Sequence, residues 1–276
     1  MTDQLRSEPD QRPTATAGLE EDPAEPVAAP AVAPQPAEIP EYGLSYRDVF
    51  WTGREYEDRC DRIAIRALLP EVGDRLIEVA AGFGRLADEY AEYESVVLFD
   101  ASAELLDAAR ERLGADPRFE FVLGDAHHLP FESASADAIV CVRAIHNFTD
   151  PAAVFAEFAR VLRPGGVLVI EFANKRHLKS IARWAARRQD WSPFSPEPHE
   201  YLPLHFDRSP ADVKQMLRTA GFRIGPTRAV SLFRLGALTR RASPELLARV
   251  ERPLQAPLGP LAIGPSVYLR ARRRRD

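Results

Sequence analysis

The stretch IEVAAGFGRLA, residues 77–87, is the clearest indication of the fold in this sequence. Its first residues are apolar and typical of a strand, the glycines at 82 and 84 predict a tight turn, and the residues after them suit a helix. A strand that passes through a glycine turn into a helix is a common ligand-binding unit, because a main chain without side chains can approach a ligand closely. The turn therefore predicts a binding site, and its ligand has to be found from the rest of the chain.

Apolar runs typical of strands alternate with helical patterns from residue 75 to residue 173. Strand and helix in alternation predict a parallel sheet that is covered by helices on both faces. Two later runs, 223–235 and 264–272, predict closing strands. The five earlier runs are RLIEVA (75–80), SVVLFD (95–100), RFEFVLGD (118–125), DAIVCV (137–142) and GVLVIEFA (166–173).

Two of the helical patterns carry a clear start signal. Asp150 is followed by Pro151, and Ser209 is followed by Pro210, so each pair predicts an N-cap residue with proline at the first helical position. Gly221 stands where the second of these helices should end.

The flanks of this pattern differ from its centre. Residues 1–40 are rich in proline, alanine and glutamate and contain no aromatic residue, which predicts a disordered tail. Residues 41–70 predict an N-terminal helical lid segment, and residues 71–276 predict the main domain. Within that domain, residues 174–208 form a basic and then proline-rich, aromatic insertion that is too long for an ordinary connection, so we expect it to shape a substrate pocket.

Composition limits the environment of the protein. The chain has 276 residues and a net charge of -5, which gives no general attraction to nucleic acid or to an anionic membrane. The only two cysteines, Cys60 and Cys141, fit neither a disulfide framework nor a zinc motif, and no run is long and apolar enough to span a membrane. We expect a cytoplasmic protein without a membrane span.

The glycine turn has two interpretations. Gly82, Gly84 and Ala87 match the dinucleotide pattern G-x-G-x-x-G/A, and Asp100 stands where an acidic residue would accept ribose hydroxyls. By itself this match is weak. More information comes from the later strand ends, GDAHHLPF (124–131) and DAIVCVRAIHNFTD (137–150).

With these strand ends the sequence resembles the class I S-adenosylmethionine-dependent methyltransferases, in particular a small-molecule branch similar to the ubiquinone/menaquinone methyltransferases. The resemblance covers residues 71–173 well and residues 205–274 more loosely. It implies an α/β, Rossmann-like, doubly wound fold whose mostly parallel seven-stranded sheet has an antiparallel last strand. The family motif, acidic-x-Gly-x-Gly-x-Gly, reads EVAAGFG at 78–84, so Ala80 replaces the first glycine. That replacement matters if residue 80 must adopt a left-handed backbone.

The resemblance also implies a site for S-adenosylmethionine, whose product is S-adenosylhomocysteine. Glu78 would lie near the cationic amino group, Asp100 would accept the ribose hydroxyls, and Asp125 would lie beside the adenine amino group. Each residue has a structural alternative as a turn or capping residue, but their order at successive strand ends favours the cofactor site. The cofactor-binding candidates are Glu78, Ala80, Gly82, Gly84, Asp100, Ala101, Asp125, Ala126, Val142 and Arg143.

Catalytic and acceptor-binding candidates come from the loops above the sheet. His146 is the candidate base, because an imidazole titrates near neutral pH, with a loop-fixing structural role as its alternative. His127 and His128 lack metal-ligand spacing, so we expect no metal site. The acceptor-side candidates are Trp51, Arg54, Tyr56, Asn147, Trp184, Tyr201 and His205.

The sequence therefore predicts methyl transfer to a small-molecule acceptor, aromatic or lipid-like, by in-line displacement. The pair His146-Asn147 stands where the quinone branch has Arg-Asn, a departure that weakens a quinone assignment. The alternatives are an NAD(P)-dependent oxidoreductase and a non-catalytic protein that binds S-adenosylmethionine. We expect no nucleic-acid partner, and the sequence leaves the oligomeric state open.

Overall fold

The structure is a computed structural model that describes residues 50–275 except 71–72, 203–204 and 235. The predicted tail at 1–40 and the first part of the lid segment, residues 41–49, lie outside the described residues.

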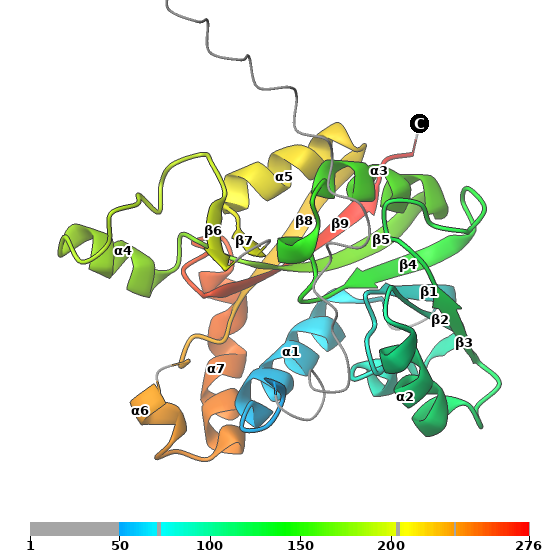
Figure 1. The fold of residues 1–276 in the computed structure, drawn as a ribbon, viewed down its shortest axis with the longest axis horizontal. Coiled ribbons are helices and arrows are strands. Elements are labelled where there is room, and N and C mark those ends of the chain that lie inside the picture. The colour runs from blue at the N-terminus through cyan, green and yellow to red at the C-terminus, as the bar shows by residue number, and fades with distance from the viewer. Residues whose placement is uncertain (1–49, 71–72, 203–204, 235, 276) are drawn as a thin grey trace, which may run out of the picture. The chain divides into compact units, whose positions relative to one another are not determined.

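Seven strands form one sheet in the order β3-β2-β1-β4-β5-β9-β8 (Figure 1). The first five are parallel, and β9 runs antiparallel to both β5 and β8. The predicted fold class is confirmed. The strands are β1 (Gly73–Val79), β2 (Tyr93–Asp100), β3 (Phe119–Leu123), β4 (Ala136–Cys141), β5 (Leu162–Ala173), β8 (Phe222–Val230) and β9 (Ser266–Arg273).

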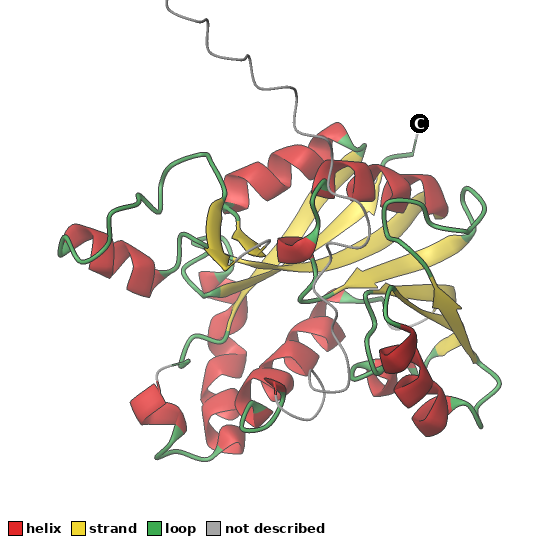
Figure 2. Ribbon diagram, viewed as in Figure 1, coloured by secondary structure: helices red, strands yellow, loops and turns green. Residues whose placement is uncertain are grey.

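Helices cover both faces of this sheet (Figure 2). α3 (Pro151–Val161) and α5 (Pro210–Thr219) pack on one face, and α1 (Glu55–Leu68), α2 (Ala103–Leu113) and α7 (Pro244–Leu258) pack on the other. The shorter elements are η3 (Ala87–Tyr90), η4 (Ile145–Asn147), α4 (Leu178–Ala185) and α6 (Gly236–Thr239), with a separate hairpin of β6 (His199–Leu202) and β7 (His205–Asp207).

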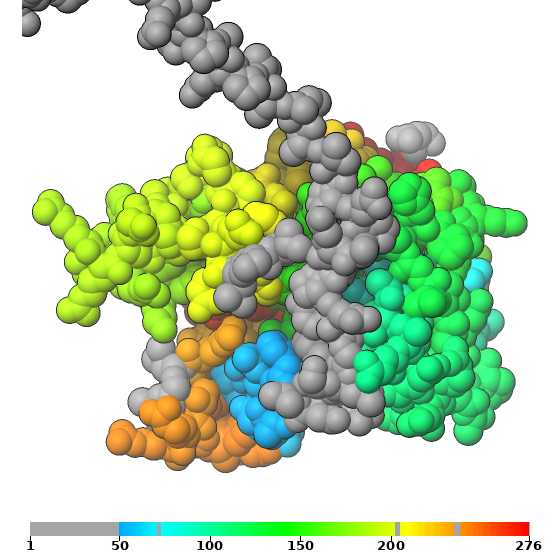
Figure 3. All heavy atoms as spheres, viewed as in Figure 1, coloured from blue at the N-terminus to red at the C-terminus, as the bar shows by residue number. Residues whose placement is uncertain are grey.

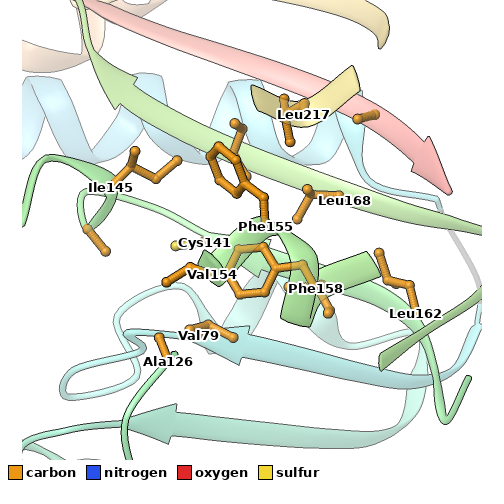
Figure 4. Close-up of a cluster of buried hydrophobic side chains, with 14 of the residues drawn as sticks. Val79, Ala126, Cys141, Ile145, Val154, Phe155, Phe158, Leu162, Leu168 and Leu217 are labelled. Carbon is orange, nitrogen blue, oxygen red and sulfur yellow. The ribbon is translucent and has the colours of Figure 1, made fainter. Parts of the chain in front are cut away.

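Alternation along the strands supplies both hydrophobic layers. Successive side chains of a strand point to opposite faces, so Ile77 and Val79 join the α3 and α5 layer while Leu76 joins the α1 layer. Figure 4 shows Phe155 and Phe158 of α3 packed among strand side chains. Both phenylalanines are completely buried, and burial of one such side chain is worth about 1.5–3 kcal/mol.

The two predicted helix starts are confirmed. Asp150 accepts a hydrogen bond from the Ala153 N–H, and Ser209 accepts one from the Asp212 N–H, with proline at the first helical position in both helices. Each cap is worth about 1 kcal/mol. Gly221 follows α5 with φ of 90°, a backbone angle that glycine adopts without strain.

Three local predictions are wrong. The glycine turn leads into the single 3₁₀ turn η3 rather than an α-helix, because only residues 85–92 separate it from β2. The run predicted as a strand over 223–235 stops at Val230, since Ser231 has φ of 61° and leaves the extended region. The second part of the insertion contains the β6–β7 hairpin, whereas the sequence predicted only a loop there.

Candidate active site

The carboxyl ends of β1 and β4 lie side by side in the middle of the sheet. The chain continues from β1 to β2 on one side and from β4 to β5 on the other, so the strand order reverses here. Open α/β sheets bind ligands at this reversal point. The glycine turn, the end of β2 and the residues that follow β4 all meet at this edge.

Three residues of the glycine turn have a left-handed backbone: Ala80 with φ of 58°, Gly82 with φ of 55° and Gly84 with φ of 70°. A Cβ at Gly82 would meet only one leucine methyl at 3.8 Å, so its outer side is open for a ligand. A Cβ at Gly84 would come within 3.1 Å of two leucine side chains, so this glycine allows close packing beneath the turn. The two glycines thus serve different purposes.

Ala80 is the strained member of the turn. A left-handed backbone costs an L-residue roughly 1–2 kcal/mol, and glycine escapes that cost. The departure from the family motif therefore falls where the first glycine has a conformational role. Ala80 and Glu78, two residues earlier, both line a small pocket at this edge.

Asp100 ties the turn to the next helix. Its carboxylate accepts hydrogen bonds from the Gly82 N–H at 2.7 Å and the Ser102 N–H at 2.8 Å. Burial raises the pKa of Asp100, and the main-chain N–H donors limit the rise. A carboxylate has about four acceptor positions, so two remain for a ligand such as a ribose. Ala101, beside it, is exposed.

Asp125 follows β3 at the same edge. Its Oδ1 accepts from the His127 N–H at 2.9 Å and lies 2.7 Å from Nδ1 of the His127 ring. Burial alone would raise the pKa of Asp125, but the hydrogen bonds from His127 outweigh it and hold the pKa below its ordinary value. Asp125 is thus ionised near neutral pH and partly exposed, and the neighbouring Ala126 is 8% exposed.

The pocket lies between the glycine turn, the end of β4 and the segment before α1. The Arg85 guanidinium stacks 3.8 Å from the centre of the Trp51 ring, and that of Arg143 lies 5.1 Å from it. Trp51, predicted on the acceptor side, therefore meets the cofactor candidates. The pocket is lined by Trp51, Glu78, Ala80, Ala81, Gly82, Phe83, Arg85, Leu86, Val142 and Arg143.

A buried acid on α1 holds both arginines. The carboxylate of Asp61, completely buried, accepts from Arg143 at 3.0 and 3.2 Å and from Arg85 at 3.0 Å. The main-chain N–H of Arg143, a residue with φ of 57°, donates to Glu171 at 2.8 Å. Because breaking such a buried pair costs several kcal/mol, the arginines are fixed in position beside the pocket.

Glu78 also lines this pocket and is buried. Burial raises its pKa to about 8, against the opposing effect of Arg85. Its Oε2 is buried beside the Tyr90 hydroxyl, and among the described residues it makes no hydrogen bond of good geometry. A buried carboxyl oxygen without such a bond is costly, so the position suits a ligand with a donor group, such as an ammonium.

His146 lies on η4, just beyond the end of β4, and stacks on His205 from β7. The ring centres are 3.9 Å apart with 31° between the planes. Burial, together with His205 and Arg143, lowers the pKa of His146 to about 3, so its ring is neutral near pH 7. Its Nδ1 is buried and makes no hydrogen bond to a described residue. A pKa this far below neutral makes the ring a weak base, so His146 can act as the candidate base only when the bound reactants raise its pKa; the loop-fixing alternative stays open.

The other acceptor-side candidates are scattered. Tyr56 is 2% exposed and its hydroxyl donates to Glu251 of α7, so the structure gives it a packing role instead of an acceptor contact. Arg54 stands at the start of α1, and Asn147 ends η4 next to His146. Trp184 and Tyr201 are exposed on the insertion, and neither lines the described pocket.

Sequence reasoning missed Asp61, Arg85 and Glu171. Asp61 had a detectable signal, since it lies at helical spacing with the apolar residues Ala64 and Ile65 and so on the buried side of its helix. Arg85 and Glu171 carry no such signal, because their partners come from distant parts of the chain.

Comparisons with known proteins match the part of the chain that contains most of this site. A family model described as a methyltransferase domain matches residues 77–170. A demethylmenaquinone methyltransferase of Clavibacter sepedonicus is 39% identical over 120 residues, which are 42% of this chain and 49% of that protein. A ubiquinone/menaquinone biosynthesis C-methyltransferase of Caulobacter vibrioides is 29% identical over 192 residues, which are 59% of this chain and 73% of that protein. This chain spans about half the length of the Clavibacter protein and of a demethylmenaquinone methyltransferase of Renibacterium salmoninarum, which is 34% identical over 137 residues.

Solved structures show the same fold at low sequence identity. A SAM-dependent methyltransferase of Thermotoga maritima superposes with a TM-score of 0.57 at 18% identity, over 84% of this chain and 96% of that one. One from Mesorhizobium loti gives a TM-score of 0.54 at 24% identity, over 76% and 96%. Residues 77–170 thus match a methyltransferase domain model, and the described part of the chain shares its fold with these two structures.

Proposed function

We propose that this chain transfers a methyl group from S-adenosylmethionine to a small-molecule acceptor. The observation that supports it most is the meeting of Asp100, the open side of Gly82 and the buried Glu78 carboxyl at the point where the strand order reverses. These groups offer acceptors for ribose hydroxyls, room for close main-chain approach and a buried carboxyl that an ammonium group beside it would ionise.

The cofactor would supply the electrophile, a methyl group on a sulfonium, and become S-adenosylhomocysteine as the acceptor is methylated. The protein then has to orient the two reactants, exclude water and, for a protonated acceptor, take up a proton. Asp100 and Asp125 would orient the nucleoside, and Glu78 would face the amino group. His146 would accept the acceptor's proton on its free ring nitrogen.

The acceptor class rests on the relatives and on the loops above the sheet. Two relatives are named for menaquinone or ubiquinone biosynthesis, so a reduced quinone is the first acceptor to test. The chain departs from the quinone branch at His146-Asn147, which makes a phenol or another flat, apolar molecule the second class. Aromatic residues of the insertion favour both.

Calorimetric titration with S-adenosylmethionine, S-adenosylhomocysteine and NADH in parallel tests the proposal. We expect micromolar binding of the first two ligands and none of NADH. Binding of NADH alone would establish the dinucleotide alternative, and cofactor binding without turnover of any acceptor would favour a non-catalytic binding protein.

Asp100→Ala should weaken cofactor binding by about 1.5–3 kcal/mol, the usual worth of hydrogen bonds to a charged group. Asp107→Ala is the matched control, because Asp107 lies on the neighbouring helix with a 68% exposed side chain. Equal affinities of the two variants would mean that the ribose is bound elsewhere.

A further inference from the structure

The insertion exposes a group of large apolar side chains. Leu178 is 61% exposed, Trp184 42%, Phe194 53% and Tyr201 68%. The rings of Trp184 and Phe194 meet edge to face with their centres 5.6 Å apart, so they form one cluster. Single exposed apolar residues are ordinary, whereas a cluster of this kind indicates a surface that meets something apolar.

The same segment is strongly basic. Residues 174–188 contain six lysines and arginines and no acidic residue, in a chain whose net charge is -5. Lys179, Arg183, Arg187 and Arg188 are exposed, and none of the four forms an ion pair with a described residue. Positive charge is therefore concentrated next to the apolar cluster.

α4 separates the two kinds of side chain. At 100° per residue, Lys179 and Arg183 lie on one side of the helix, and Leu178, Ile181 and Trp184 lie on the other. α4 and the loop after it, yellow-green in Figures 1 and 3, stand away from the sheet and its covering helices. The helix is thus amphipathic without a large packed partner of its own.

We propose that the insertion docks this chain on an anionic lipid bilayer, with α4 lying in the plane of the membrane surface. Tryptophan and phenylalanine favour the interfacial region of a bilayer, and lysines and arginines beside them gain from the negative surface potential. No described helix is long and apolar enough to cross a bilayer, so the docking is peripheral. The proposal goes beyond methyl transfer and does not require it.

The docking surface is connected to the candidate active site through the fold. The insertion starts at the carboxyl end of β5, and its hairpin places His205 against His146. Lys175, 1% exposed, donates to the Ser195 hydroxyl at 2.8 Å and so ties the first part of the insertion to its loop. The insertion thus joins the proposed docking surface to the edge of the sheet where the candidate site lies.

Vesicle co-sedimentation of the full chain tests the docking. We expect binding to phosphatidylcholine vesicles with about 30% phosphatidylglycerol, weak binding to pure phosphatidylcholine, and loss of binding at high salt. Replacing Lys179, Arg183 and Arg187 with glutamine should weaken binding roughly 100-fold, at about fivefold for each charge. Trp184→Ala with Phe194→Ala should weaken it about tenfold or more.

Control variants carry the same kinds of substitution within α7 and just before it. Arg240, Arg249 and Arg252 are exposed, and their replacement by glutamine removes equal charge elsewhere. Leu246→Ala with Val250→Ala removes exposed apolar side chains of 51% and 47%. Neither control should change vesicle binding by more than about twofold, and equal effects of control and test variants would overturn the proposal.

Tryptophan fluorescence gives a second readout that needs no loss of binding. Brominated lipid should quench the wild type more than Trp184→Phe, which keeps an aromatic side chain in the cluster. Equal quenching would place Trp184 outside the bilayer and overturn the proposal. Two other results would overturn it. The protein could fail to bind anionic vesicles and instead dimerise or bind nucleic acid, and the basic and aromatic variants would then abolish that dimerisation or nucleic-acid binding.

Discussion

At the carboxyl edge of the sheet, Arg85 and Arg143 are only 12% exposed and both bind the buried Asp61, whereas the side chains of α4 in the insertion are mostly exposed. The first region lies within or directly against residues 77–170, the part that matches the methyltransferase family, and the insertion begins after it. In the function proposed above, the fixed region would bind the methyl donor, which is the same in all S-adenosylmethionine-dependent methyltransferases. The looser region would contact the partner, which differs between them.

Asp61→Ala should have the largest effect on the stability of the fixed region, the carboxyl edge around Asp61, Arg85 and Arg143. This variant removes the carboxylate that Arg85 and Arg143 share. Arg85 keeps its ion pair with Asp58, but the Arg143 guanidinium loses its carboxylate in a largely buried position, so the free energy of unfolding should fall by about 3–5 kcal/mol. Urea denaturation measures it. Asp107→Ala, which removes an exposed ion pair, should cost at most about 1 kcal/mol. Similar losses in the two variants would show that the buried cluster adds no special stability.

Glu78 should make the stability of the fixed region depend on pH. Burial raises its pKa from 4.5 to about 8, so the folded protein keeps a proton that the unfolded chain has lost. The stabilising effect is complete below the unfolded pKa and disappears as the pH rises through the folded pKa. Between pH 5 and 8 the wild type should lose on the order of 3 kcal/mol of unfolding free energy relative to Glu78→Gln.

Thermal or urea unfolding across this pH range measures the difference. Glu120→Gln is the control, since its side chain is 56% exposed on the neighbouring part of the sheet. A pH dependence that is the same in wild type and Glu78→Gln would show that Glu78 is already ionised in the folded protein.

The parts of the molecule that were predicted correctly depend on local signals. Strand runs, proline and cap residues, and the glycine turn each act over a few neighbouring residues, so the sheet and the positions of Asp100 and Asp125 followed from them. The backbone of Ala80 did not follow, because the sequence shows an alanine and the fold imposes the left-handed angle.

The parts that could not be predicted depend on contacts between distant segments. Asp61 and Arg143 are far apart in the sequence and meet only when α1 packs against β4. His146 and His205 likewise come together through the β6–β7 hairpin, which lies in a polar, proline-rich stretch without strand periodicity. Local patterns therefore predicted the positions of the residues at the strand ends better than those of the residues in the insertion.

His146→Ala tests the contact between the two regions, where His146 lies against His205 of the insertion. If the neutral ring accepts the acceptor's proton, kcat should fall roughly 100-fold, and S-adenosylhomocysteine affinity should stay nearly unchanged. Because burial, His205 and Arg143 lower its pKa to about 3, the pH–rate profile of the wild type should show no limb near pH 6.5 from this residue. The exposed His128, replaced by alanine, is the control. Normal turnover of His146→Ala would leave the residue a purely structural role.

The smallest expected effect comes from Ala80→Gly, which removes strain from the fixed region. Glycine accepts the φ of 58° that costs alanine roughly 1–2 kcal/mol, but it also loses more entropy on folding, so the net gain in unfolding free energy should be about 0.5–1 kcal/mol. Ala81→Gly, next to it and without a left-handed backbone, should change stability in the opposite direction by about 0.5–1 kcal/mol. Opposite signs at adjacent alanines would isolate the backbone angle as the cause. If both variants lose stability, the turn gains more from the Ala80 methyl in its pocket than it loses to strain.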